Sequence, residues 1–342
     1  MWLSSDIGID LGTASILVHL KGKGIVLHEP SVVAIDQGTR SVLAVGEEAQ
    51  RMLGKTPGNI VAMRPLSDGV IADFDTTEIM LRHYIQKVKA RRRLIRPRVV
   101  VCVPAVTTSV EQKAVMEALT RIGAREAYLI EEPRAAALGA GMDIFKPSGS
   151  MVVDIGGGTT DIAVLSLGGV VESTSVRVGG DRFDEAITRY IKKEYNILIG
   201  ERTSENLKKQ VGTAYRHSRE LNMEVRGRDL VQGLPRAVTI TTQEVLEALE
   251  ELLEEIVQGV KQVMENTPPE LSRDIVEKGV VLTGGGAMLD GLSQLLTVET
   301  GVPFYLAEDP VSSVVKGTAM VLEHMDDLSP SLVSTRKTGS YA

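Results

Sequence analysis

Two short stretches of this chain repeat one pattern: an apolar strand, an aspartate, a turn with glycine and threonine, and a second apolar strand. The first carries Asp10 and the second Asp154, which are 154 − 10 = 144 residues apart. Glycine lets backbone N–H groups close on an anion, and an aspartate at a strand end is placed to hold a hydrated divalent cation. Each stretch therefore predicts a phosphate-binding β-hairpin. For one stretch alone, a glycine-rich hairpin without a ligand is the alternative.

The repetition favours the ligand-binding interpretation and predicts a chain built from two related halves. Two such hairpins facing each other would hold a nucleotide between them. With 342 residues, 43% of them hydrophobic, the chain is long enough for two cores. We expect domain I to comprise residues 1–145 with about 310–328, and domain II residues 146–309. A small β-rich insertion is expected at about 30–65, and a disordered polar tail at 329–342.

Composition narrows the class of protein. The net charge of −7 and the pI near 5.5 argue against nucleic acid as the principal partner. Cys102 lies in an apolar run, which is typical of a buried structural thiol in a reducing compartment. The N-terminus does not resemble a signal peptide, and no apolar run approaches the roughly 18 residues of a membrane span. We expect a cytoplasmic protein, with contact to a membrane surface left open.

Local patterns place further polar groups. Capping boxes predict helix starts at Thr108 and Thr241. The segment Glu131–Pro133 ends a strand where a helix begins, so a carboxylate there can orient water toward a phosphate. A surface glutamate pair before a proline is the alternative. Glu205 and Lys208 stand three residues apart on one helix face, where pairing in solvent is the alternative role.

Glycines precede two more predicted helices. Gly179 and Gly180 open one of them, an arrangement that favours anions near the helix N-terminus. A strand ending at Thr283 breaks into the glycine turn Gly284–Ala287, where a flat ring can lie against bare backbone. The following helix is expected from Met288.

A basic segment interrupts the first half. Seven cations and no acid fall between Lys87 and Arg98, around one apolar pair. A solvated loop is one interpretation. The other is a membrane contact, in which each cation binds anionic headgroups with about 1 kcal/mol and the apolar pair enters the acyl boundary. The expected contact residues are Leu94, Ile95, Arg91, Arg92 and Arg93, with Trp2, the only tryptophan, as a weak addition.

Taken together, these motifs resemble the superfamily of actin, sugar kinases and DnaK-type chaperones. Within it the chain is most similar to the MreB family of bacterial actin homologues, Mbl-type members included, over roughly residues 6–325. Phrases typical of that family occur at residues 24–35, 64–74, 198–203 and 267–272. The resemblance implies an α/β, actin-like ATPase fold with nucleotide in the interdomain cleft. It has two duplicated RNase H-like domains, each with a smaller inserted subdomain, the second at about 182–240.

The resemblance also implies residue roles. Asp10 and Asp154 would position Mg²⁺ through water, with Asp154 also catalytic. Glu132 would orient the attacking water, and Glu131 is the weaker candidate. No lysine follows Gly12 as in a P-loop, so metal and backbone dipoles would offset phosphate charge. The implied ATP contacts are Gly12, Thr13, Ala14, Gly156, Gly157, Gly158, Thr159, Gly179, Gly180, Glu205, Lys208, Gly284, Gly285, Gly286 and Ala287.

By the same resemblance, the protein would be a slow Mg-dependent ATPase that polymerises into paired filaments on the inner face of the cell membrane. It would organise cell-wall elongation to set rod shape, with MreC, MreD, RodZ and RodA-type proteins as partners and no nucleic acid. Arg134 and Asp161 depart from the residues expected there, but both leave the phosphate ligands intact. Which paralogue it is, MreB, Mbl or MreBH, stays open.

Two other functions share the fold. A small-molecule kinase would need a sugar-binding pocket and a base aimed at a hydroxyl group. A DnaK-type chaperone ATPase would need a peptide-binding β-domain after the second half, where only a short tail stands.

The membrane interpretation makes a prediction. Replacing Leu94 and Ile95 together by serine lowers binding to anionic liposomes, because the apolar anchor is lost while the cations stay. Co-sedimentation measures the change, and vesicles of neutral lipid serve as the control for the electrostatic part. Unchanged co-sedimentation with anionic vesicles would remove this segment from membrane contact.

Overall fold

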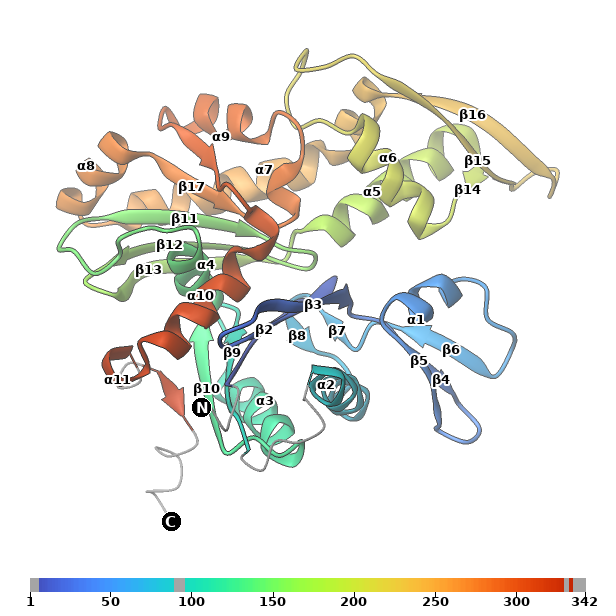
Figure 1. Ribbon diagram of the computed structural model, residues 1–342. Helices are drawn as coiled ribbons and strands as arrows, with labels where there is room; N and C mark the ends of the chain where they lie inside the picture. Colours follow the sequence, from blue (N-terminus) through green and yellow to red (C-terminus); the bar gives the residue numbers. More distant parts are fainter. Residues whose placement is uncertain (1–5, 89–95, 329–331, 335–342) are drawn as a thin grey trace.

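Two sheets, one from each half of the chain, repeat the same strand plan. The structure, a computed structural model, describes residues 6–88, 96–328 and 332–334 (Figure 1). In each sheet an antiparallel hairpin gains parallel strands on one side and an antiparallel strand on the other. The first sheet runs β19 (Val333–Ser334), β10 (Glu126–Glu131), β9 (Arg98–Val103), β1 (Ile7–Leu11), β2 (Ser15–Leu20), β3 (Gly24–Pro30). The second runs β13 (Gly169–Val176), β12 (Thr160–Ser166), β11 (Ser150–Ile155), β17 (Val280–Thr283), β18 (Phe304–Leu306).

Helices cover the outer faces of the sheets and fill the layer between them (Figure 1). In the first half, α2 and α3 pack against the sheet, and in the second half α7 packs along β12 and β13. The helices are α1 (Glu47–Met52), α2 (Phe74–Val88), α3 (Ser109–Arg121), α4 (Glu132–Gly139), α5 (Gly180–Tyr195), α6 (Glu201–Val211), α7 (Thr242–Asn266), α8 (Pro269–Lys278), α9 (Leu292–Thr300), α10 (Ser313–Glu323) and α11 (Met325–Leu328).

The layer between the sheets consists of α4 and α10, which cross at very short range (Figure 1). A Cβ on Gly139 would lie 1.7 Å from the carbonyl oxygen of Ser313, and one on Gly317 would lie 1.9 Å from that of Ala135. Glycine at both positions is therefore what lets the two backbones approach. Because α10 also packs against β1 and β2, the C-terminal part of the chain returns to the first half.

Two smaller sheets stand at one end of the molecule, beyond the main sheets (Figure 1). The first is packed with α1, and the second with α5 and α6. A short β-hairpin follows the first small sheet and consists of β7 (Leu66–Ser67) and β8 (Val70–Ile71). The strands of the small sheets are β4 (Val33–Asp36), β5 (Val42–Val45), β6 (Ile60–Met63), β14 (Ile197–Leu198), β15 (Asn222–Asp229) and β16 (Pro235–Thr241).

Several local predictions are confirmed. Thr108 and Thr241 both form reciprocal capping boxes, at the N-termini of α3 and α7. Cys102 is 2% exposed within β9, as expected of a structural thiol. In the described ranges, no helix is both long enough and apolar enough to cross a membrane.

Two local predictions are wrong. The helix expected from Met288 begins at Leu292, because a 3-10 turn, η1 (Gly286–Met288), and Gly291 in the left-handed region come first. The tail expected to be disordered contains an ordered part, since β19 pairs antiparallel with β10 and Leu332 is buried. The proposed membrane residues, Trp2, Arg91, Arg92, Arg93, Leu94 and Ile95, lie outside the described residues.

The α7 cap allows a stability prediction. The Thr241 hydroxyl accepts a hydrogen bond from the Glu244 backbone, and the Glu244 carboxylate accepts one from the Thr241 backbone N–H at 2.8 Å. Thr241→Ala should lower the free energy of unfolding by about 1 kcal/mol, because an N–H at the helix end loses its partner. Urea unfolding followed by circular dichroism measures the loss. Thr241→Ser keeps the cap, so an equal loss in that variant would contradict the explanation.

Candidate functional site

The two glycine hairpins close in the same way. In the β1–β2 turn the Gly12 N–H donates to the Ser15 carbonyl at 3.1 Å, and in the β11–β12 turn the Gly156 N–H donates to the Thr159 carbonyl at 2.8 Å. Each turn is preceded by an aspartate on the last part of its first strand. The repeat seen in the sequence is therefore a repeat of backbone geometry.

The hairpins also meet each other. A Cβ on Gly157 would lie 2.5 Å from the Cβ of Ala14, and one on Gly158 would lie 2.6 Å from Thr13 Oγ1. Real Cβ atoms do not approach so closely, so these two positions need glycine for the turns to touch. The pairing of the two motifs across one gap, which the sequence predicts, is confirmed.

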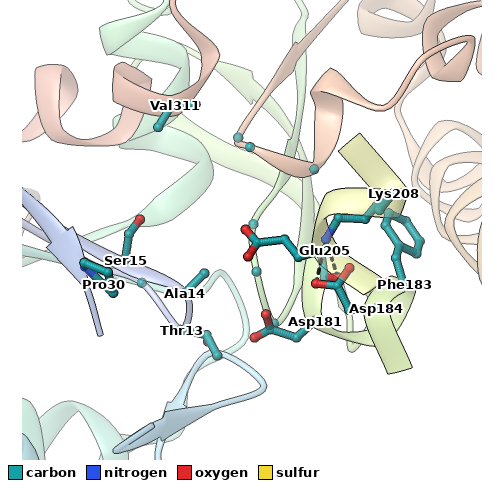
Figure 2. Close-up of a pocket in the computed structure, with 18 of the residues that line it drawn as sticks. Thr13, Ala14, Ser15, Pro30, Asp181, Phe183, Asp184, Glu205, Lys208 and Val311 are labelled. Carbon is teal, nitrogen blue, oxygen red and sulfur yellow. Dashed lines mark hydrogen bonds and ion pairs between the residues drawn. The ribbon is translucent and has the colours of Figure 1, made fainter. Parts of the chain in front are cut away.

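Asp10 and Asp154 line the same cleft, a cavity of about 1510 Å³ between the halves. Figure 2 shows the cleft with Thr13 and Ala14 of the first hairpin facing Asp181 and Glu205 of the second half. Two of the predicted ligand contacts, Gly179 and Ala287, do not line it. Gly179 packs behind the second hairpin instead, where a Cβ would lie 2.6 Å from the Gly157 carbonyl oxygen. The predicted residues that line the cleft are Asp10, Gly12, Thr13, Ala14, Glu132, Asp154, Gly156, Gly157, Gly158, Thr159, Gly180, Glu205, Lys208, Gly284, Gly285 and Gly286.

The N-terminus of α5 supports the second hairpin. The Gly180 N–H donates to the Gly156 carbonyl at 3.0 Å, and the Asp181 N–H donates to the Gly157 carbonyl at 2.8 Å. The N–H groups of Gly180 and Asp181 are already used in this way, so the Gly180 N–H is not free to bind an anion, whereas the ligand contact of Gly179 stays a prediction. The two hydrogen bonds hold the turn that carries the predicted phosphate contacts.

Acidic side chains from both halves gather at the base of the cleft. Burial raises the pKa of Asp10 to about 6. Burial also raises the pKa of Asp154, and the charges of Asp161 and Asp10 raise it further. The pKa of Glu132, the first residue of α4, is raised well above its usual range by burial and by Asp161, Asp10 and Asp154. This concentration of negative charge favours a bound cation.

One oxygen among these acids has no partner. Asp154 Oδ1 is buried and accepts no hydrogen bond from the described residues. An unpaired buried carboxylate oxygen is unfavourable, and a hydrated cation would satisfy it. The described residues bring no three His, Cys, Asp or Glu side chains together as direct metal ligands. The residues present therefore fit an ion held through water, and that coordination stays a prediction.

The two adjacent glutamates differ in environment. Glu132 lines the cleft beside the aspartates, whereas the side chain of Glu131 is 41% exposed and lies 4.0 Å from Arg134. The Cys102 thiol donates to Asp10 Oδ1 at 3.4 Å. Of the pair, Glu132 has the position expected of a residue that acts on water in the cleft.

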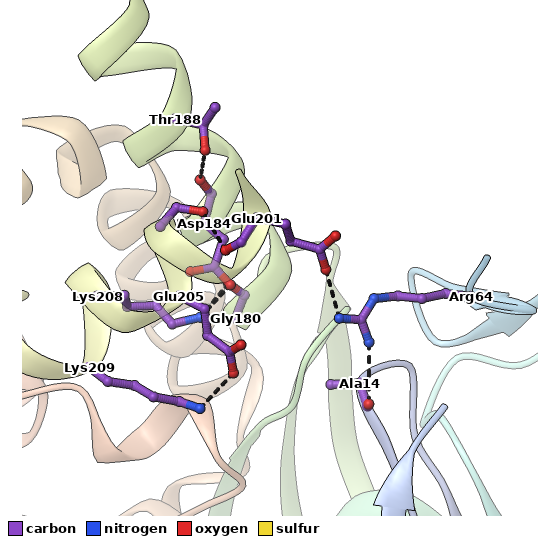
Figure 3. A network of polar contacts seen from close by, with 10 residues as sticks. Ala14, Arg64, Gly180, Asp184, Thr188, Glu201, Glu205, Lys208 and Lys209 are labelled. Carbon is purple, nitrogen blue, oxygen red and sulfur yellow. Dashed lines mark hydrogen bonds and ion pairs between the residues drawn. The ribbon is translucent and has the colours of Figure 1, made fainter. Parts of the chain in front are cut away.

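Glu205 and Lys208 do not pair with each other. Lys208 Nζ donates to the Gly180 carbonyl at 2.7 Å and to Asp184 at 2.9 Å, so it ties α6 to α5 (Figures 2 and 3). Glu205 pairs with Lys209 at 2.5 Å (Figure 3). Both residues line the cleft, but Lys208 is held by the protein rather than paired in solvent.

Several residues that line the cleft were missed by sequence reasoning. Met288 is 59% exposed, and its place directly after the glycine turn is the sequence feature that could have identified it. Arg64 and Asp184 act through partners distant in sequence, which leave no local pattern. Cleft-lining residues that the sequence did not indicate include Arg64, Asp181, Asp184 and Met288.

Comparisons with known proteins agree with this geometry. The chain matches a family model described as MreB/Mbl protein over residues 4–330. It is 58% identical over 323 residues to the cell shape-determining protein Mbl of Bacillus subtilis (strain 168), covering 94% of this chain and 97% of the relative. It is 54% identical over 328 residues to the cell shape-determining protein MreB of Escherichia coli (strain K12), covering 94% of each.

Solved structures show the same fold. A crystal structure of MreB5 of Spiroplasma citri bound to ADP has a TM-score of 0.91 and 37% identity, covering 95% of this chain and 98% of that one. The AMPPNP-bound structure has a TM-score of 0.91 and 36% identity, covering 97% and 99%. The duplicated sheets around one cleft are thus an actin-like fold. The chain belongs to the MreB/Mbl family, and it is a bacterial actin homologue that sets cell shape.

The acidic cluster predicts a pH dependence. Asp10 has a folded pKa of about 6 against an ordinary value of 3.8, so folding favours its protonated form. At low pH Asp10 is protonated in both states, whereas at pH values above about 6 the folded protein must hold a buried charge. Without ligands, the free energy of unfolding of Asp10→Asn relative to wild type should therefore rise by about 2–3 kcal/mol when the pH is raised from about 4 to about 7.5.

Unfolding midpoints in urea at both pH values measure this gain. Asp36→Asn is the matched control, because hydrogen bonds from Thr39 and Gly38 lower the pKa of Asp36, and its pH trend should have the opposite sign. An Asp10→Asn effect of the same size at both pH values would contradict the explanation.

Proposed function

We propose that the cleft binds ATP together with Mg²⁺ and that the protein hydrolyses the ATP slowly. The observation that carries this proposal is the contact between the two glycine turns above the unpartnered oxygen of Asp154. The glycine turns offer backbone N–H groups to phosphates, and the carboxylate beside them favours a bound cation. Support comes from the MreB5 relatives, which were solved with ADP and with AMPPNP.

Each predicted contact has a part in this proposal. The turns Gly12–Ala14 and Gly156–Thr159 approach the β- and γ-phosphates with their backbones. Asp10 and Asp154 hold the ion through water, and when bound the ion offsets phosphate charge. Glu205, Lys208 and the turn Gly284–Gly286 flank the nucleoside, with Gly284 in the left-handed region at φ 85°.

Glu132 orients the attacking water. It begins α4 at the end of β10, which fixes it at the carboxyl edge of the first sheet and inside the cleft. The phosphoryl transition state is loose, so hydrolysis requires mainly placement of water and compensation of charge. Asp154 contributes to the placement of water and to the compensation of charge, because it lies opposite the first hairpin.

The wider cell biology is part of the same proposal. We place the protein in the cytoplasm, on the inner face of the membrane, as paired filaments whose assembly is coupled to ATP. Its further partners are the anionic membrane surface and the cell-wall elongation proteins MreC, MreD, RodZ and RodA. Membership of the MreB/Mbl family supports this. The proposal also includes the domain organisation. The domain limits lie at residues 145, 309 and 328, and the inserted subdomains at about 30–65 and 182–240.

Sedimentation and electron microscopy on anionic vesicles test the polymer proposal. Samples with ATP, with ADP and without nucleotide are compared, and vesicles of neutral lipid control for lipid charge. Filaments that form on anionic vesicles with ATP support the proposal. A protein that stays monomeric and phosphorylates a sugar or binds peptides would overturn it.

Glu132 provides a test of the chemistry. Glu132→Ala should bind ATP as wild type does but release phosphate about a hundredfold more slowly, because the attacking water loses its acceptor. Glu131→Ala is the matched control, since that side chain is largely outside the cleft. Phosphate release and binding of a fluorescent ATP analogue are measured in parallel. Unchanged turnover in Glu132→Ala would remove this residue from its role.

A further inference from the structure

The short segment after β6 touches both glycine hairpins. The Gly69 N–H donates to Thr13 Oγ1 of the first hairpin at 3.1 Å. A Cβ on Gly69 would lie 3.0 Å from Thr159 Cγ2, and one on Gly158 would lie 3.0 Å from the Asp68 backbone nitrogen. The β7–β8 turn therefore lies between the hairpins, and the residue that begins this segment is Arg64.

Arg64 contacts both halves of the molecule. Its Nη1 donates to the carbonyl oxygen of Ala14 at 3.3 Å, in the turn of the first hairpin. Its Nη2 donates to Glu201 at 2.8 Å, at the first position of α6 (Figure 3). Arg64 and Glu201 are 137 residues apart in sequence, and this ion pair crosses the cleft.

The guanidinium suits this double contact. Its planar fork presents donors in several fixed directions, so Nη1 can bind a carbonyl while Nη2 binds a carboxylate in another part of the chain. The Arg64 side chain is 21% exposed and that of Glu201 is 53% exposed, so the pair is partly shielded from solvent. A weaker pair spans the same gap, where Arg182 of α5 lies 3.9 Å from Asp68.

We propose that Arg64 is a positioning residue that ties the first phosphate hairpin to α6 and so keeps the cleft closed over bound nucleotide. The inference rests on the proposed nucleotide site and adds the residue that retains the ligand there. Leaving the cleft requires the halves to separate, and separation breaks the Arg64–Glu201 pair. The rate of nucleotide release therefore depends on that pair.

The expected size of the effect is modest. Partly exposed ion pairs contribute little, and a charged hydrogen bond adds somewhat more. Loss of the pair should accelerate nucleotide release by about threefold to tenfold. Because an exposed pair is screened by ions, added salt should accelerate release from wild type and have less effect once the pair is removed.

The experiment measures release of a fluorescent ATP analogue by stopped flow. The proteins are wild type, Arg64→Ala, Glu201→Ala and the double variant. Both single variants should release the analogue faster than wild type. Arg64→Ala should accelerate release less in the Glu201→Ala background than in wild type, because the interaction between the two residues is already absent there. Arg273→Ala, which removes an exposed arginine–glutamate pair within α8, should release at the wild-type rate.

Each outcome decides the matter. Glu201 is an exposed surface residue, so Glu201→Ala keeps the test valid even if Arg64→Ala does not fold. A wild-type release rate in Glu201→Ala, or fully additive effects in the double variant, would overturn the role of Arg64 and leave the proposed function intact. Failure of wild type to bind the analogue would instead overturn the proposed function, and this inference with it.

Discussion

The contact between the two glycine turns is the constraint on which the rest of the structure depends. Gly157 and Gly158 stand where any side chain would collide with Ala14 and Thr13. The turns reach each other because α4 and α10 cross closely between the two sheets, again through glycine. Helix α5 then supports the second turn by donating to its carbonyl groups. Backbone approach at these few positions brings two distant parts of the chain into one site.

That contact also brings several carboxylates close together, and their mutual repulsion is unfavourable without a ligand. Asp10, Glu132 and Asp154 meet where burial raises the pKa of each, and the mutual repulsion raises the pKa of Glu132 and Asp154 further. Such a cluster destabilises the unliganded protein at neutral pH, and a cation relieves it. A ligand that binds only the folded protein stabilises it, and the stabilisation grows with the logarithm of the ligand concentration relative to Kd. The site therefore makes the stability of the whole chain depend on what occupies the cleft.

The sequence predicts the parts of the site that depend on residues close together in the chain. Both hairpins follow from a short repeated pattern of strand, aspartate and glycine, and the caps at Thr108 and Thr241 follow from residues three apart. Long-range partners leave no such pattern. The pairing of Arg64 with Glu201, and that of Lys208 with Asp184, are set by how the halves pack.

Backbone donors are the hardest to predict. The sequence does not reveal that the N–H groups at the start of α5 are already used by the neighbouring turn. The delayed start of α9 has a similar cause, since Gly291 adopts a left-handed conformation that the glycine pattern alone does not locate.

The most direct test of the central claim is a crystal structure with AMPPNP and Mn²⁺ in place of Mg²⁺, using the anomalous signal of manganese to locate the ion. The account predicts one manganese peak between the two hairpins, within reach of water molecules on Asp10 and Asp154, with the phosphates against both turns. A nucleotide bound at one hairpin alone, or an ion outside the cleft, would contradict it.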